Sequence, residues 1–254
     1  MKSLFTTAVA AVLLAMACAA YGFPSLHGAT GIVLAPTADT AKFGSLQVAA
    51  SFYQTGDDAL VDDTWIARAM FGLLPNIEVG ASFWRTQSAD EDVDTLIGDA
   101  KLQFPLGLLG FDSALGAKIA TTDLPGGESL NVQQAYLAMT RGIFGIPGGM
   151  QTLGLTVGTN WTKLDNAASE DAFRFFAALE LMLMDSLSVA AEYQTEESDL
   201  GDDDPLTSIV ARLAISTTLT LEAGATNANP LTGGFTAGGD HNLFASIAFG
   251  WGGE

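Results

Sequence analysis

The sequence predicts an all-β fold: a transmembrane, antiparallel, up-and-down β-barrel of about twelve strands that follows a cleaved signal peptide. Stretches of about ten residues alternate apolar and polar side chains, as the strands of such barrels do. The stretch 45–55 is an example, because its Leu46 and Val48 point to one face and Gln47 between them points to the other. The connectors alternate between short turns and longer acidic loops, which is typical of a sheet whose two rims face different compartments.

Each alternating stretch is predicted to be one strand, because period two places every second side chain on the same face. No continuous apolar run after the N-terminal segment is long enough for a membrane helix. A chain of this kind can span a membrane only as a closed barrel, since open strands leave backbone groups unpaired in lipid. The predicted strands are 45–55, 64–73, 77–86, 97–104, 113–121, 132–141, 152–162, 172–182, 187–195, 206–215, 219–226 and 242–249.

The connectors sort their charge by position along the chain. Most acidic residues lie in the long connectors, whereas the short ones hold only Asp112 and Asp185. A soluble sandwich has no physical reason for this sorting, but a membrane barrel does, and we expect acidic loops outside and tight turns with both termini on the periplasmic side. The long connectors are 56–63, 87–96, 122–131, 163–171, 196–205 and 227–241, and the short ones are 74–76, 105–112, 142–151, 183–186 and 216–218.

The N-terminal stretch 1–22 has the features of a secretory signal peptide. Lys2 precedes an apolar run over 8–14, and small residues follow that run. We expect cleavage before Phe23, so that the protein lies in the bacterial outer membrane after export. Cleavage there also removes Cys18 and leaves a chain without cysteine chemistry.

Two further parts follow the signal peptide. A turn-rich periplasmic segment over 23–44 leads into the barrel over 45–254. The sequence leaves two alternatives open for 23–44, which either plugs the barrel or trails into the periplasm.

The composition combines a strong negative charge with a high content of apolar residues. The formal net charge is −19 at pH 7, which repels nucleic acid and excludes it as a partner. The mean hydropathy is nevertheless positive. Both properties are compatible if the acidic residues lie in loops and the apolar residues face lipid.

Several charged residues interrupt the predicted strands, nearly all on the polar face. A lysine or arginine that faces lipid near the bilayer centre costs roughly 2–4 kcal/mol, so these side chains are expected to face the lumen. One interpretation is an internal salt-bridge network that braces the barrel, and the other is a charged constriction that selects solutes. We favour bracing, because a barrel near this size has little free lumen. The predicted luminal charges are Arg68, Glu78, Asp99, Lys101, Lys118, Arg174, Glu180, Glu192, Arg212 and Glu222.

Aromatic residues near strand ends are typical of the girdles that membrane barrels place at the two lipid–water interfaces. The last strand ends at Phe249 or Trp251, as in the C-terminal signal that the barrel-assembly machinery recognises. The predicted girdle residues are Phe52, Tyr53, Trp65, Phe71, Phe83, Trp84, Trp161, Phe249 and Trp251.

The sequence predicts no catalytic, cofactor or metal site. His27 and His241 are the two histidines, and no motif marks a serine or aspartate partner for either. The acidic run 90–94 has carboxylates at alternate positions like a calcium loop. Thr95 and Lys101 stand where that loop needs a glycine and a bidentate glutamate, so we interpret the run as a solvated acidic loop.

The run Gly28–Ala38, GATGIVLAPTA, followed by Gly44, resembles the opening motif of YjbH-like outer-membrane proteins associated with exopolysaccharide. The run 98–101, GDAK, and the run 74–80, LPNIEVG, resemble patterns of this and related barrel families. The chain is much shorter than full-length members and would correspond to one barrel unit. The resemblance implies an outer-membrane barrel.

We therefore expect a non-enzymatic outer-membrane barrel that gives porin-like passage to small solutes or supports envelope or exopolysaccharide export. The alternatives are a pore-less structural or surface-interaction barrel and a secreted β-sandwich adhesin. Expected partners are outer-membrane lipid and the barrel-assembly machinery. Candidate ligands are small solutes, polysaccharide and divalent cations at the acidic loops, and no cofactor is expected.

Overall fold

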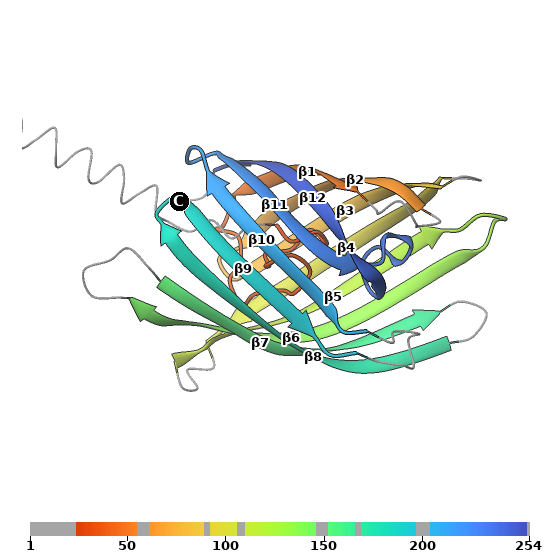
Figure 1. The fold of residues 1–254 in the computed structure, drawn as a ribbon. Helices are drawn as coiled ribbons and strands as arrows, with labels where there is room; N and C mark the ends of the chain where they lie inside the picture. Colours follow the sequence, from red (N-terminus) through yellow and green to blue (C-terminus); the bar gives the residue numbers. More distant parts are fainter. Residues whose placement is uncertain are drawn as a thin grey trace, which may run out of the picture.

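The computed structural model describes residues 24–54, 61–88, 92–105, 110–145, 152–165, 169–196 and 204–252. These residues form a closed, antiparallel, up-and-down barrel of twelve strands (Figure 1). The predicted fold class and strand count are therefore confirmed. The strands are β1 (Leu46–Gln54), β2 (Val61–Leu74), β3 (Ile77–Ser88), β4 (Val93–Phe104), β5 (Asp112–Asp123), β6 (Ser129–Gly145), β7 (Thr152–Asp165), β8 (Ser169–Met184), β9 (Leu187–Gln194), β10 (Leu206–Ala214), β11 (Leu219–Ala228) and β12 (Ala237–Trp251).

The barrel closes by pairing its first and last strands. β1 and β12 are antiparallel over their whole shared length, from Leu46 opposite Trp251 to Gln54 opposite Leu243. Each other strand pairs with its neighbours in the sequence. The sheet therefore has no open edge, as a strand structure within lipid requires. Among the described residues, no helix is long and apolar enough to cross a membrane.

Period-two alternation sets the inner and outer faces of the wall. Along β1, Gln47, Ala49, Ser51 and Tyr53 are buried, and the residues between them are exposed or half-buried. The outer face carries large apolar side chains, with Ile119 66% exposed. An apolar surface that surrounds the whole barrel has no counterpart among soluble monomers and is suited to lipid contact.

Replacing Ile119 with lysine is expected to destabilise the barrel by roughly 2–4 kcal/mol, because the ammonium would face the hydrocarbon near the middle of β5. The matched control is the replacement of Ser129, the outward-facing first residue of β6, with lysine. This change should cost less than about 1 kcal/mol, because Ser129 lies at the rim. Guanidinium titration in phospholipid bilayers measures both. Equal costs for the two lysines would contradict a lipid-facing belt at Ile119.

Some strands are longer than predicted, mostly at the long-loop rim. β6 covers Ser129–Gly145 instead of 132–141, and β12 starts at Ala237 instead of 242. These extensions mix apolar residues such as Leu130 and Phe144 with polar and glycine residues, so a regular hydropathy alternation does not mark them. The predicted signal peptide 1–22 and many loop acids lie outside the described residues. Those acids are Asp57, Asp58, Asp90, Glu91, Glu197, Asp199, Asp202 and Asp203.

The girdle prediction is wrong for two residues. Tyr53 and Trp84 are fully buried and point into the barrel, because each lies on the inward parity of its strand. Trp65 and Trp251 are more than half exposed on the outer face, as a girdle requires.

Residues 24–38 are buried inside the barrel and 39–44 lead out to β1 at the rim, so of the two alternatives for the predicted segment it adopts the plug (Figure 1). We call residues 24–44 the plug. Its backbone folds on itself, with Leu26 N–H donating to the Val33 carbonyl at 2.7 Å and Ile32 N–H donating to Ala35 at 2.9 Å. Leu26, Ile32, Val33 and Ala35 are all at most 2% exposed.

Candidate functional site

The lumen is filled from both ends. The plug enters at the short-turn rim, where it continues into β1. The connector 229–236, between β11 and β12, folds inward from the opposite rim, and we call it the inner loop. Its short 3-10 helix, η3 (Pro230–Thr232), ends at Gly233, whose φ of 62° lies in the left-handed region that favours glycine. Phe235 of the inner loop is 2% exposed.

Glu192 on β9 binds the middle of the plug. Its carboxylate accepts hydrogen bonds from the backbone N–H groups of Val33, Leu34 and Ala35, each at 3.0 Å. Ser208 on β10 donates to the same carboxylate at 2.9 Å. Consecutive N–H groups that converge on one anion form a nest, and hydrogen bonds to a charged acceptor are among the stronger ones.

Glu78 on β3 ties Thr30 to Ala41 near the C-terminal end of the plug. It accepts the backbone N–H of Thr30 at 2.7 Å and that of Ala41 at 2.6 Å, and the Thr30 hydroxyl also donates to it. Lys101 on β4 pairs with Glu78 at 2.8 Å. The same ammonium donates to the carbonyls of Thr30 at 3.0 Å and Thr37 at 3.2 Å.

The arginines of the wall bind backbone carbonyl groups of the plug and the inner loop. Arg68 on β2 donates to Pro24 at 2.8 Å, and Arg174 on β8 donates to Phe235 at 2.6 Å. Arg212 on β10 donates to Gly31 at 3.1 Å and to the next carbonyl, that of Ile32. The wall cations therefore bind carbonyl groups of the plug, because ammonium and guanidinium groups donate. The wall carboxylates bind its backbone N–H groups, because carboxylates accept.

Some wall charges also pair with one another, as the bracing interpretation expects. Arg68 lies 2.8 Å from Glu222 on β11, and Arg212 lies 3.1 Å from the other oxygen of that carboxylate. Arg212 also lies 3.5 Å from Glu180 on β8. The Asp99 carboxylate accepts the Tyr136 hydroxyl at 3.0 Å.

The structure places all ten sequence-predicted charged residues at inward-facing strand positions. Nine are buried, and the Glu180 side chain is 36% exposed. What sequence reasoning missed is their partner, since most of them bind the backbone of the plug or the inner loop. The one sequence signal for that partner is the turn-rich motif at 28–38.

Close packing on β3 brings the plug against the wall. A Cβ added to Gly80 would lie 2.7 Å from the backbone nitrogen of Ala29, and one added to Gly28 would lie 2.8 Å from the backbone nitrogen of Ala81. Both positions therefore need glycine for space, and Gly28 also has a φ of 109°. Two glycines, one from the wall and one from the plug, let the two backbones touch.

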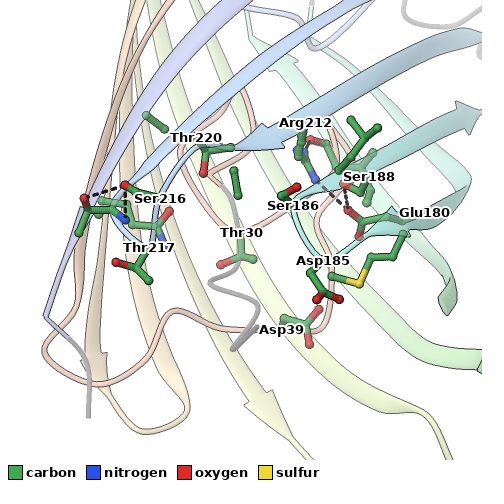
Figure 2. Close-up of a pocket in the computed structure, with 18 of the residues that line it drawn as sticks. Thr30, Asp39, Glu180, Asp185, Ser186, Ser188, Arg212, Ser216, Thr217 and Thr220 are labelled. Carbon is green, nitrogen blue, oxygen red and sulfur yellow. Dashed lines mark hydrogen bonds and ion pairs between the residues drawn. The ribbon is translucent and has the colours of Figure 1, made fainter. Parts of the chain in front are cut away.

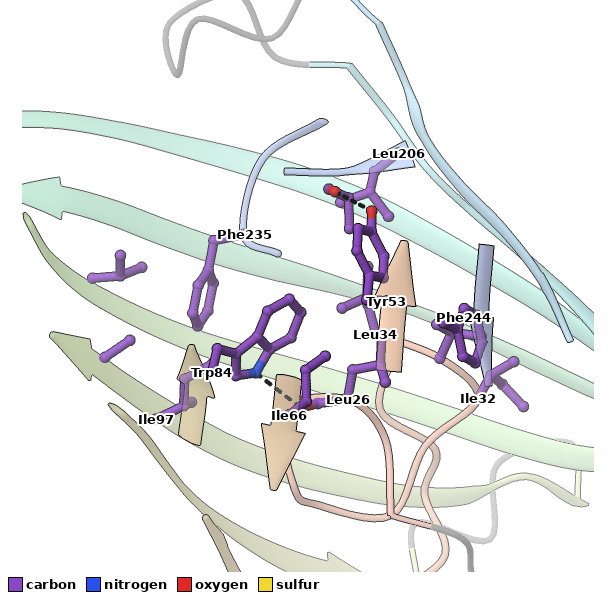
Figure 3. Packing of buried hydrophobic residues seen from close by; sticks show 14 of the residues in the cluster. Leu26, Ile32, Leu34, Tyr53, Ile66, Trp84, Ile97, Leu206, Phe235 and Phe244 are labelled. Carbon is purple, nitrogen blue, oxygen red and sulfur yellow. Dashed lines mark hydrogen bonds between the residues drawn. The ribbon is translucent and has the colours of Figure 1, made fainter. Parts of the chain in front are cut away.

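Towards the inner loop the plug packs on apolar side chains (Figure 3). Leu26 and Leu34 of the plug lie among Tyr53, Trp84 and Phe235, all at most 2% exposed. The Trp84 indole N–H donates to the Leu26 carbonyl at 3.3 Å. The Tyr53 hydroxyl donates to the carbonyl of the last β11 residue at 2.5 Å. The plug therefore has a polar and an apolar contact zone.

A pocket of about 260 Å³ remains between the plug and β8–β12 at the short-turn rim (Figure 2). Asp39 of the plug is exposed there, and Glu180, Asp185 and Arg212 come from the wall side. The plug therefore does not fill the rim, and the blocked part of the lumen lies deeper. Hydroxyl groups in the lining come from Thr30, Thr37, Ser186, Ser188, Ser216, Thr217, Thr218 and Thr220.

The two histidines lie in different places. His27 is buried in the plug, and His241 is exposed on β12, with its Nε2 2.8 Å from the Thr207 hydroxyl. In the acidic run 90–94, the Asp94 carboxylate accepts two hydrogen bonds from Arg85, at 2.8 and 2.6 Å. Among the described residues, no three His, Cys, Asp or Glu side chains are grouped so that they could hold a metal ion.

The comparisons with known proteins concern the fold. The KdgM porin has a TM-score of 0.56 at 8% identity, and the same porin in complex with disordered oligogalacturonate has 0.56 at 6%. Each match covers 82% of this chain and 99% of the other. Omp33 of Acinetobacter baumannii has a TM-score of 0.49 at 11% identity, over 83% of this chain and 99% of that one. No protein-family model and no curated protein matches the chain. The chain therefore has the fold of an outer-membrane β-barrel, and its own plug lies in the lumen.

Proposed function

We propose that the protein resides in the outer membrane and passes small polar solutes only when the plug leaves the lumen. The observation that carries this proposal is the chemistry of the contact between plug and wall. Glu78, Glu192, Lys101 and Arg212 bind main-chain groups of the plug, and each could exchange that partner for water. A wall vacated by the plug would be lined by charged side chains that hydrate readily, which is the property of a water-filled channel.

The fold match supports the proposal, since KdgM is a porin. Support of exopolysaccharide export is a related role that rests on the resemblance of Gly28–Ala38. That motif forms most of the plug, so an export role would act through the same displaceable segment.

A pore-less structural barrel is the second candidate, and the apolar contact zone favours it. Release of the plug would expose Leu26 and Leu34 to water together with Trp84 of the wall. Burying each such side chain stabilises by about 1.5–3 kcal/mol, so this zone opposes release. The two candidates differ in whether ions ever cross the barrel.

Conductance of Gly80→Ala in planar bilayers tests the proposal. The new Cβ would clash with backbone atoms of Gly28 and Ala29 at 2.7 Å without straining β3, so the plug has to shift. Overpacking of this kind costs about 1–3 kcal/mol, which corresponds to about a 5- to 150-fold rise in open probability. The expected result is rare current steps for the wild type and frequent steps of the same size for the variant.

Gly98→Ala on the neighbouring strand is the control. A Cβ at Gly98 meets only a side-chain atom of Ile119 at 3.6 Å, which is ordinary contact. This variant should match the wild type. If wild type and Gly80→Ala are both silent, the pore-less barrel is the correct alternative.

A further inference from the structure

His27 joins three parts of the molecule. It belongs to the plug, its Nε2 lies 2.9 Å from the Gly233 carbonyl of the inner loop, and its Nδ1 lies 2.9 Å from the Lys118 ammonium of β5. The imidazole also stacks on Phe235 of the inner loop, with ring centroids 4.5 Å apart and planes 16° apart. The residue is 3% exposed. One side chain therefore fastens the plug to both the inner loop and the wall.

The two hydrogen bonds define the protonation state of this histidine. A carbonyl oxygen only accepts, so Nε2 carries the hydrogen that Gly233 receives. An ammonium only donates, so Nδ1 is the unprotonated nitrogen that accepts from Lys118. The closed arrangement therefore requires the neutral imidazole. A second proton would turn Nδ1 into a donor that faces another donor, and would place two positive charges 2.9 Å apart.

The surroundings offer the imidazolium little compensation. Lys118 itself faces the carboxylates of Asp99 on β4 and Glu192 on β9, and also the Lys101 ammonium. From β3, Trp84 presents an uncharged ring 6.2 Å away. On the loop side, the Phe235 carbonyl is taken by Arg174 of β8. Burial and the Lys118 ammonium hold the pKa of His27 well below its ordinary value.

We infer that His27 is an acid-sensitive latch: its protonation turns the hydrogen bond to Lys118 into a repulsion between two cations, which loosens the plug from the wall and so opens the lumen. This inference rests on the proposed function, because opening matters only if solutes pass. The latch requires no new partner, since the proton itself is the ligand.

The direction of the pH effect follows from proton linkage. The released plug carries a solvated His27 with a pKa of about 6.5, and the closed state binds a proton less readily. Above about pH 6.5 both states are neutral at His27, and this residue makes the equilibrium between them no more or less dependent on pH. Below it the released state gains a proton that the closed state lacks, so release increases by up to about tenfold per pH unit.

Hydrogen exchange of the purified full chain in lipid bilayers tests the latch without relying on conductance. After correction for intrinsic exchange rates, protection of the plug amides is expected to fall about fivefold between pH 6.5 and 5.5 in the wild type, because only half of the released His27 is still neutral at pH 6.5. The matched variant is His27→Gln, whose amide can donate to Gly233 and accept from Lys118 but does not titrate. Its plug protection should stay constant over the same range.

Two results would overturn the latch. One is wild-type plug protection that does not change with pH, which is decisive even if His27→Gln fails to fold. The other is an equal decline in His27→Gln, or a decline that the strand amides share, which would indicate unfolding of the barrel. The proposed function fails separately if plug exchange responds to acid while the membrane current stays absent at every pH. The proposed function holds without the latch if the protein conducts and the protection of the plug amides does not change with pH.

Discussion

Replacing Glu192 with alanine is expected to raise the open probability of the barrel more than about 100-fold. The carboxylate accepts three backbone N–H groups of the plug, from Val33, Leu34 and Ala35, and the variant leaves all three without that acceptor. A buried donor that loses its partner costs about 1 kcal/mol or more. Three such donors amount to about 3 kcal/mol, and a tenfold change corresponds to about 1.4 kcal/mol. Single-channel recording in planar bilayers measures the change.

Gln194→Ala is the control for Glu192→Ala. Gln194 lies two residues further along β9, is also buried, and accepts from Asn160 of β7 at 3.2 Å. Its loss disturbs the same wall without removing a plug contact. An equal rise in open probability for both variants would mean that general loosening of β9, and not the carboxylate, controls the plug. Glu192→Gln should give an intermediate rise, since it keeps an acceptor oxygen but loses the charge.

Replacing Glu222 with leucine is expected to destabilise the barrel by about 3–5 kcal/mol. Its carboxylate is the shared counter-ion of Arg68 at 2.8 Å and Arg212 at 3.1 Å. Removing it leaves two guanidinium groups close together in the barrel interior without that partner, and a leucine cannot satisfy their N–H groups. The free energy of unfolding from guanidinium titration in bilayers measures the loss.

Glu180→Leu is the matched control, because Glu180 also pairs with Arg212. That pair is longer, at 3.5 Å, and the Glu180 side chain is 36% exposed. Water already screens it, so its removal should cost about 1 kcal/mol or less. Comparable losses for the two glutamates would show that burial does not determine the worth of these pairs.

The barrel could be predicted from the sequence because its signals are local. Alternation within each strand assigned Arg68 and Glu222 to the inner face from their immediate neighbours. The length and acidity of each connector assigned it to one of the two rims of the barrel. Each of these features occupies a short stretch of chain, so no knowledge of distant contacts was needed.

The arrangement of the lumen could not be predicted in the same way. Glu192 binds Leu34, which is 158 positions away in the sequence. Its partners are main-chain N–H groups, and such groups are identical at nearly every residue, so no side-chain pattern marks them. The same applies to the Gly233 carbonyl, which accepts the hydrogen bond from Nε2 of His27. The motif at 28–38 indicated that these residues matter, but its turn-forming composition did not indicate where they lie.

The positions of Glu78 and Glu192 have a mechanical consequence for the whole molecule. Glu78 is on β3 and Glu192 is on β9, and a ring of twelve strands places these two strands on opposite sides. The short run from Thr30 to Val33 connects the two carboxylates across the diameter. The number of strands and their tilt determine the width of the barrel. The run therefore works as a cross-brace that ties two opposite sides of the wall to each other.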